Sequence, residues 1–373
     1  MKHGKKRLRM SIAALGLTAV LLAGGCGGNG DDGAASGTIS LQYSTYMAPE
    51  SALTSPVREW LEEIAKADDA TTQEIEYFYQ EALLGATDTI PGVRDGRADI
   101  GHSIALYHPA ELPLSQIVGV PFATNDMAAQ ARAFNYLYDN NDAFRAEWDA
   151  FGVRVLSFAP NPGSYIGTNF PVNSLEDLRG RSLRAAGMLS SAVEAIGVNP
   201  VALAAPEIYE SIERGVIDGH TSNPFEITVK LGFHEVAPYF TEPFTGLYNL
   251  VVIVMNPDVY ESLPQSVKDY IVESRDDYID RHAEAFLEAD RAACDQLLAE
   301  GGHASVLPEA EVEKWKNLLG DSLYDEWRAT AVASGLSEAE VDGFRSDYER
   351  ALDTFASPSA QATSGLAECA ARG

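Results

Sequence analysis

The chain has 373 residues, of which 46% are hydrophobic, and this is enough apolar material for two packed domains. Asp and Glu number 55 against 27 Lys and Arg, which gives a net charge of −28 at pH 7. Such a charge repels a phosphate backbone, so we expect no nucleic-acid partner. Capture of an anion would need a well-placed local cation, and solubility is the simplest interpretation of the acidity itself.

The first 25 residues have the pattern of an export signal. A basic head that ends at Arg9 precedes an apolar run over 10–23. About 14 residues are too few to cross a bilayer as a helix, but they suit the hydrophobic region of a signal peptide. We therefore expect an exported chain that works outside the cytoplasmic membrane.

The small residues before Cys26 resemble the lipobox of bacterial lipoproteins. That resemblance implies that Cys26 is lipidated and becomes the N-terminus of the mature protein. Residues 26–37 are rich in glycine and polar residues and are predicted to be a flexible tether. The chain would then be anchored to the outer face of the cytoplasmic membrane by lipid only, and simple cleavage of the signal is the alternative.

Two further cysteines, Cys294 and Cys369, would lie in an oxidising compartment once the chain is exported. We predict that they form a disulfide, which would attach the C-terminal tail to a helix. Two unrelated buried thiols are the alternative.

Strands and helices alternate in the first part of the body. The predicted elements are a strand over 38–45, a helix over 55–67, a strand over 74–79, a helix over 88–95 and a strand over 98–101. This order favours a mostly parallel sheet covered by helices, with ligands received at the carboxyl ends of the strands.

A second block repeats the alternation, and its first helix is preceded by a capping-box pattern from Ser174 to Asp177. The predicted elements that follow are a strand over 182–185, a helix over 189–196, a strand over 199–203, a helix over 206–214 and a strand over 216–219. An apolar strand over 247–255 and one very long helix over 264–300 come next. A helix of about 37 residues would extend about 55 Å, so we expect it to span both units.

These elements predict an α/β, two-lobed, periplasmic-binding-protein-like fold. Each lobe would be a mostly parallel sheet with flanking helices. Lobe I is assigned residues 38–167 plus 249–288, and lobe II residues 168–248 plus 289–373. Two lobes joined in this way can close on a small ligand.

Several motifs, in their order and spacing, resemble the substrate-binding proteins of tripartite ATP-independent periplasmic (TRAP) transporters. The motifs are VRDGRADI at 93–100, LEDLRGRSLR at 175–184, GVNPV at 197–201, GVIDG at 215–219, Asn223-Pro224 and MNPDVY at 255–260. The resemblance covers residues 41–270. It implies a protein that captures a small organic acid by lobe closure and delivers it to ion-gradient-driven TRAP membrane subunits. It also implies that the chain is not an enzyme and needs no cofactor.

Within this resemblance, Arg184 falls on the arginine that binds the ligand carboxylate. A guanidinium offers two parallel N–H donors to a carboxylate and keeps its charge when partly buried. An arginine paired with a surface acid is the alternative. Asn223 matches the family's asparagine, although the loop from Asp218 to Pro224 is one residue longer than usual. A turn-forming asparagine before proline is the alternative there.

Aromatic residues near the predicted strand ends are the other candidates for ligand contact. Some acidic-sugar binders of the family carry a second arginine where this chain has Phe170, so we favour a monocarboxylate with a ring or apolar body over a dicarboxylate. Tyr46, Tyr107, Phe225 and Tyr248 are further candidates for the walls of a pocket. Ordinary core packing is the alternative for each of these aromatic residues.

Other functions find less support in the sequence. The Gly163-Ser164 segment is not a nucleophile elbow, and His234-Glu235 lacks the second histidine of a zinc helix. We therefore expect no metal site, and an exported hydrolase is the weaker alternative. A binding protein of an ATP-driven importer is the nearer one, and a structural lipoprotein without a ligand is the third.

Overall fold

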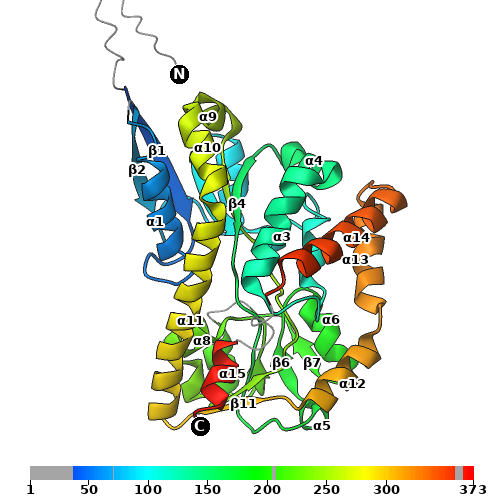
Figure 1. Cartoon of the computed structure of the whole chain (residues 1–373). Coiled ribbons are helices and arrows are strands. Elements are labelled where there is room, and N and C mark those ends of the chain that lie inside the picture. Colours follow the sequence, from blue (N-terminus) through cyan, green and yellow to red (C-terminus); the bar gives the residue numbers. More distant parts are fainter. Residues whose placement is uncertain (1–36, 70, 204–206, 358–363) are drawn as a thin grey trace, which may run out of the picture. The chain divides into compact units, whose positions relative to one another are not determined.

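The computed structural model describes residues 37–69, 71–203, 207–357 and 364–373 (Figure 1). The predicted signal peptide, the lipidation site Cys26 and the tether up to residue 36 lie outside the described residues. Within the described part of the chain, no helix is both long enough and apolar enough to cross a membrane.

The first sheet has five strands in the order β2-β1-β3-β10-β4. Its strands are β1 (Gly37–Thr45), β2 (Thr71–Phe78), β3 (Ile100–Ile104), β4 (Arg154–Ala159) and β10 (Val251–Met255). Only β10 among them runs against its neighbours, because its pairings with β3 and β4 are antiparallel and the others are parallel. The mostly parallel sheet predicted for this lobe is therefore confirmed.

Helices cover both faces of this sheet, because alternate residues of β10 lie in two separate apolar cores with different helices. They are α1 (Ser55–Ile64), α2 (Thr89–Arg94), α3 (Met127–Asn140) and α4 (Asp142–Phe151), with short 3₁₀ turns η1 (Ala105–Tyr107) and η2 (Ser115–Gly119). Side chains cap two of these helices, since Asp126 accepts from the backbone of α3 and Asn141 from that of α4. Helix α1 begins beside Pro56 and buries Trp60 completely.

The second sheet has six strands in the order β11-β9-β5-β8-β6-β7. Its strands are β5 (Ile166–Thr168), β6 (Ser182–Arg184), β7 (Asn199–Val201), β8 (Gly219–His220), β9 (Tyr239–Glu242) and β11 (His303–Val306). Here β5 is the reversed strand, so this sheet is also mostly parallel. Its helices are α5 (Leu175–Leu178), α6 (Met188–Ala195), α7 (Ile208–Glu213), α8 (Phe225–Lys230) and the 3₁₀ turn η4 (Phe233–Glu235). The capping box of Ser174 and Asp177 is present at α5.

Two extended segments, 160–165 and 243–250, carry the chain between the sheets. The second segment was predicted in part as a strand, but residues 247–250 do not belong to β10. Leu247 instead donates its backbone N–H to the carbonyl oxygen of Thr124 at 3.1 Å. Gly246 has a φ of +90°, and a Cβ there would lie 2.8 Å from the same oxygen. Only glycine fits this close crossing without strain.

The long helix expected over 264–300 is present with an interruption. After α9 (Pro257–Ser262), it comprises α10 (Gln265–Glu273) and α11 (Arg275–Ala299). At the junction the Ser274 hydroxyl donates to the Tyr270 carbonyl at 2.7 Å and accepts from the indole of Trp60 at 2.8 Å. A serine that bonds back to the preceding turn bends a helix, which explains the break.

Helix α11 packs on both sheets, as the sequence analysis expected. Tyr278 and Phe286 lie in the apolar core of the first sheet. Cys294 and Leu297, two to three turns further on, lie in the core beside the second sheet. One rigid element therefore contacts both halves.

Three helices near the C-terminus were not predicted individually: α12 (Glu309–Leu319), α13 (Ser322–Ala333) and α14 (Glu338–Phe355). Residues 289–373 were assigned to lobe II, but α14 packs against α3 and α4 beside the first sheet. The ring of Tyr348 lies 5.1 Å from that of Phe134, and the ring of Phe344 lies 5.1 Å from that of Phe144. The apolar face of α14 is buried there, and the division of the chain into lobes remains a proposal.

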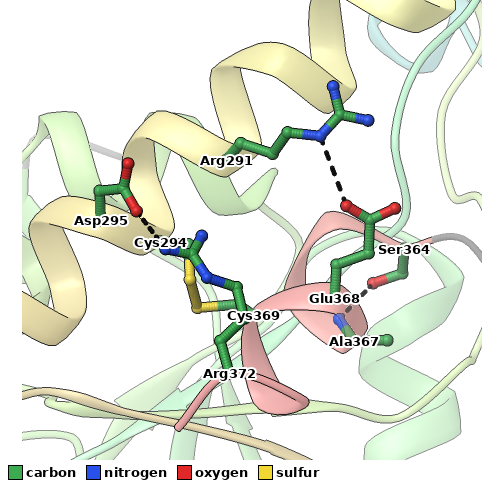
Figure 2. The surroundings of a disulfide bond; sticks show 8 residues. All are labelled: Arg291, Cys294, Asp295, Ser364, Ala367, Glu368, Cys369 and Arg372. Atoms are coloured by element: carbon green, nitrogen blue, oxygen red, sulfur yellow. Dashed lines mark hydrogen bonds and ion pairs between the residues drawn. A yellow bond between two sulfur atoms is a disulfide. The ribbon is translucent and has the colours of Figure 1, made fainter.

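The predicted disulfide between Cys294 and Cys369 is present and joins α11 to α15 (Gly365–Ala370) (Figure 2). Both cysteines are buried. Two ion pairs join the same helices on either side of it, Arg291 with Glu368 at 3.5 Å and Arg372 with Asp295. The prediction from export and cysteine count is confirmed.

Replacement of both Cys294 and Cys369 by serine should lower the free energy of unfolding by about 4 kcal/mol. The bridge joins residues 75 positions apart. It therefore lowers the entropy of the unfolded chain, and the length of the closed loop gives the expected size of the effect. Urea unfolding of the two proteins, with Cys26 replaced by serine in both, measures the difference. A difference below about 1 kcal/mol would contradict a stabilising role for the bridge.

Candidate functional site

A cavity of about 630 Å³ receives the carboxyl ends of strands from both sheets. Tyr46 follows β1, Tyr107 lies just beyond β3, Arg184 ends β6, and Asn223 follows β8. Tyr248, from the segment that crosses between the sheets, also lines the cavity. Five of the seven residues predicted to contact a ligand therefore line one cavity, at the strand ends where parallel α/β sheets receive ligands, and their contact with a ligand stays a prediction.

The structure places Phe170 and Phe225 elsewhere. Phe225 is fully buried and packs edge-on against Tyr165 and Phe240, whose ring centroids are 5.9 and 5.5 Å away. Phe170 lies under the guanidinium of Arg181, which is 4.3 Å from its ring centroid. Neither ring is among the described residues that line the cavity, because one packs in the core and the other under Arg181, and their contact with a ligand stays an untested prediction.

Backbone carbonyls hold the guanidinium of Arg184. Its Nε–H donates to the Leu203 carbonyl oxygen at 3.1 Å, and Nη1 donates to those of Thr221 and Ser222, each at 3.1 Å. Ser222 has a φ of +66°, an unusual conformation for a residue other than glycine. Its backbone N–H donates to the Ser164 hydroxyl at 2.6 Å, and its own hydroxyl accepts from the Ala186 N–H at 3.1 Å. The loop is thus fixed in a strained form that points carbonyls at the arginine.

The charge of Arg184 has no protein counter-ion in the described part of the chain. No carboxylate there lies within 4.0 Å of the guanidinium, and no described residue accepts from Nη2. Burial lowers the pKa of Arg184, and Tyr248 and Tyr107 act in the opposite direction. The neighbouring His220 pairs with Arg184 in the sheet, and burial first and the arginine second lower its pKa to about 3. His220 is therefore neutral, and Arg184 supplies one positive charge with unused donors.

Tyrosines form the wall that faces this charge. The rings of Tyr46 and Tyr107 meet edge to face with centroids 5.8 Å apart. Burial raises the pKa of Tyr46 and of Tyr248, so both phenols stay protonated and neutral. Aromatic surfaces with polar tips can hold an apolar body while their hydroxyl groups donate hydrogen bonds.

One face of α8 closes another side of the cavity. It carries two rows at i, i+4 spacing, Glu226 with Lys230 and Ile227 with Leu231. Lys230 forms an ion pair with the buried Glu226 at 3.0 Å. These residues were not predicted from the sequence, although their spacing directly after Asn223-Pro224 could have indicated them.

A buried carboxyl group anchors α8 from behind, and a second one holds α15 in place. Asp290 of α11 accepts the backbone N–H of Glu226 at 3.1 Å, and Gly365 of α15 packs directly on its side chain. Glu242 accepts from the Phe244 N–H at 2.8 Å and from the Ser364 hydroxyl. Burial raises the pKa of Glu242 to about 7, although both hydrogen bonds act to lower it. The disulfide-linked helix α15 therefore covers the residue that holds α8.

Among the described residues, no group of three or more His, Cys, Asp or Glu side chains is placed to hold a metal ion. The chemistry available at the cavity is one fixed cation, neutral phenols, side-chain amides and an apolar wall. Groups of this kind can bind and orient a small solute, and together with the two-sheet fold they are typical of the class of the solute-binding proteins.

The chain belongs to family 7 of the bacterial extracellular solute-binding proteins, DctP, whose model matches residues 43–330. It is 25% identical over 196 residues to the ectoine-binding periplasmic protein TeaA of Halomonas elongata. That match covers 50% of this chain and 57% of TeaA, so the chain spans little more than half the length of this relative.

Solved structures of TRAP periplasmic solute-binding proteins share the fold. The protein from Desulfovibrio salexigens, with the C-terminus of a symmetry mate in its ligand-binding site, matches with a TM-score of 0.74 and 26% identity. That match covers 85% of this chain and 96% of the other. The protein from Bordetella bronchiseptica, with bound (R)- and (S)-mandelate, matches with a TM-score of 0.67 and 25% identity over 84% of this chain and 99% of the other. These likenesses confirm the two-lobed α/β fold and the resemblance on which the sequence analysis relied.

The Glu242→Gln variant should gain stability relative to the parent protein as the pH rises. The folded-state pKa of about 7 lies above the ordinary value of 4.5, so the contribution of Glu242 is fully present below pH 4.5 and is lost as the pH rises through 7. Glutamine does not titrate. The difference in unfolding free energy between variant and parent should therefore increase by about 2–3 kcal/mol from pH 5 to pH 8.

Urea unfolding at the two pH values measures this change. Glu326→Gln, on the exposed face of α13, is the control for the same chemical substitution at the surface. An equal difference at pH 5 and pH 8 would show that Glu242 is not the buried, proton-retaining group described above.

Proposed function

We propose that this protein captures a small organic acid outside the cytoplasmic membrane and delivers it to the membrane subunits of a TRAP transporter. The observation that carries the proposal is Arg184, a partly buried cation without a protein counter-ion in the described part of the chain, at the wall of a tyrosine-lined cavity. A carboxylate is the group that best matches the planar donors of a guanidinium.

The contacts of Arg184 favour a carboxylate over a neutral ligand. Three backbone carbonyls occupy Nε and Nη1, but they leave the positive charge without compensation by an acid. A ligand carboxylate would supply that compensation and would accept from Nη2. The two similar structures are consistent with this proposal, since one holds mandelate and the other holds a polypeptide C-terminus in its ligand site.

The ligand proposed is a monocarboxylate with an aromatic or apolar body. Arg184 and Lys230 are the cationic side chains among the described residues that line the cavity. Lys230 is already paired with Glu226, so a second carboxylate would meet a neutralised site. Ile104, Leu106 and Ile227 provide apolar contact for the rest of the molecule.

Closure of two lobes would bury the ligand and change the surface that meets the membrane subunits. The segments 160–165 and 243–250 and helix α11 are the connections about which the proposed lobes would move. The ligand favours closure only to the extent that it binds the closed form more tightly than the open form. Arg184 would contribute mainly to binding in the closed form. The proposed lipid at Cys26 would keep the protein beside its membrane partner.

The Arg184→Ala variant should bind its acid roughly 30-fold or more weakly, because a desolvated charge pair of about 2–5 kcal/mol is lost. A thermal-shift panel of aromatic and aliphatic monocarboxylates would first identify acids that stabilise the parent protein. Isothermal titration calorimetry with those acids then gives the dissociation constants of parent and variant.

Arg179→Ala is the matched control, because Arg179 is exposed, forms an ion pair with Glu176 and does not line the cavity. Its affinity should equal that of the parent. Unchanged affinity in Arg184→Ala would refute the role proposed for the guanidinium. A parent protein that responds to no acid in the panel would refute the ligand class.

A further inference from the structure

Asn249 is a buried polar residue of the cavity whose side chain has no hydrogen-bond partner among the described residues. It lines the cavity and is 6% exposed, and its Oδ1 is enclosed without a donor. The other two asparagines of the cavity differ from it. The amide of Asn161 donates to the Pro162 carbonyl at 3.2 Å, and that of Asn223 donates to the Thr221 carbonyl at 3.3 Å.

The backbone around Asn249 is firmly placed. Val251 pairs with Ile104 in the first sheet, and the carbonyl oxygen of Leu250 accepts from the Ala105 N–H at 2.9 Å. The backbone that carries Asn249 is therefore held at the end of a β-ladder. The cavity wall at this point therefore has a fixed backbone and presents an Oδ1 atom without a donor among the described residues.

The sequence neighbour of Asn249 indicates which end of a ligand it would meet. Tyr248 interacts electrostatically with Arg184, so its phenol lies near the guanidinium. Consecutive Cα atoms are about 3.8 Å apart, and both side chains line the same cavity. Because Asn249 directly follows Tyr248 and lines the same cavity, we infer that it lies at the end of the cavity that Tyr248 shares with Arg184.

A buried carbonyl oxygen without a donor is unfavourable, and a ligand that brings a donor removes the penalty. An ammonium group at this end would be repelled by Arg184. A 2-oxo group offers only an acceptor to Oδ1. A hydroxyl group is neutral and donates, and on the carbon next to the carboxylate it would lie at this end of the ligand.

We propose that Asn249 is a specificity-determining residue that accepts a hydrogen bond from the 2-hydroxyl group of a 2-hydroxy monocarboxylate bound to Arg184. This inference rests on the proposed function and narrows its ligand class. It assigns the carboxylate to Arg184, the hydroxyl to Asn249 and the remaining apolar body to the tyrosine and aliphatic walls.

Three acids with the same body test the assignment: 3-phenyllactate, 3-phenylpropanoate and phenylpyruvate, which carry a 2-hydroxyl, no substituent and a 2-oxo group. Calorimetry on the full chain should show that 3-phenyllactate binds at least 10-fold more tightly than each of the others, a difference of about 1.4 kcal/mol. In Asn249→Leu, which keeps the size of the side chain and removes its polarity, this ratio should fall below 2-fold. A purely structural role would weaken all three acids equally and leave the ratio unchanged.

Each outcome either supports or overturns the role proposed for Asn249. Equal binding of 3-phenyllactate and 3-phenylpropanoate by the parent protein would mean that water satisfies Asn249, and the inference would be overturned while the carboxylate proposal stands. Tighter binding of phenylpyruvate would overturn it in favour of an amide that donates. Binding of none of the three would overturn the inference and count against the proposed function as well. If Asn249→Leu does not fold, the comparison of the three acids on the parent protein still tests the preference for a 2-hydroxyl group.

Discussion

The cavity is organised around the guanidinium of Arg184, which is held by backbone carbonyls and has no acid partner among the described residues. Carbonyl dipoles orient Arg184 without neutralising it, whereas a carboxylate would have done both. Placing an uncompensated cation inside a protein is costly, so the surrounding structure must pre-organise it. In a chain with a net charge of −28, this is also how a local site can attract an anion that the whole molecule repels.

The supporting structure extends outward from that cation in identifiable steps. Ser222, in its left-handed conformation, presents the carbonyls, and Ser164 and Ala186 fix it. The loop continues into α8, whose first turn is held by Asp290 of α11. Helix α11 packs on both sheets and is linked by the disulfide to α15, which covers Asp290 (Figure 2). The ligand loop is thus connected to a helix that contacts both halves of the fold.

The sequence predicted those features that depend on local pattern. Alternating elements predicted two mostly parallel sheets, and strand ends located Arg184, Asn223 and three tyrosines at one cavity. It could not predict features set by tertiary packing. Phe170 and Phe225 look like pocket aromatics in sequence, but neighbouring side chains bury or cover them. The enclosed Oδ1 of Asn249, without a donor among the described residues, and the interruption of the long helix at Ser274 depend on contacts with distant segments, which no local pattern records.

The most direct test of the central claim compares an acid with its neutral amide, for example 3-phenylpropanoate with 3-phenylpropanamide, by calorimetry on the unmodified protein. The two molecules have almost the same shape and apolar surface, so their difference reports the negative charge that Arg184 is proposed to receive. We expect the amide to bind at least 30-fold more weakly than the acid, about 2 kcal/mol. An amide that binds as tightly as the acid would show that the uncompensated charge of Arg184 does not determine recognition.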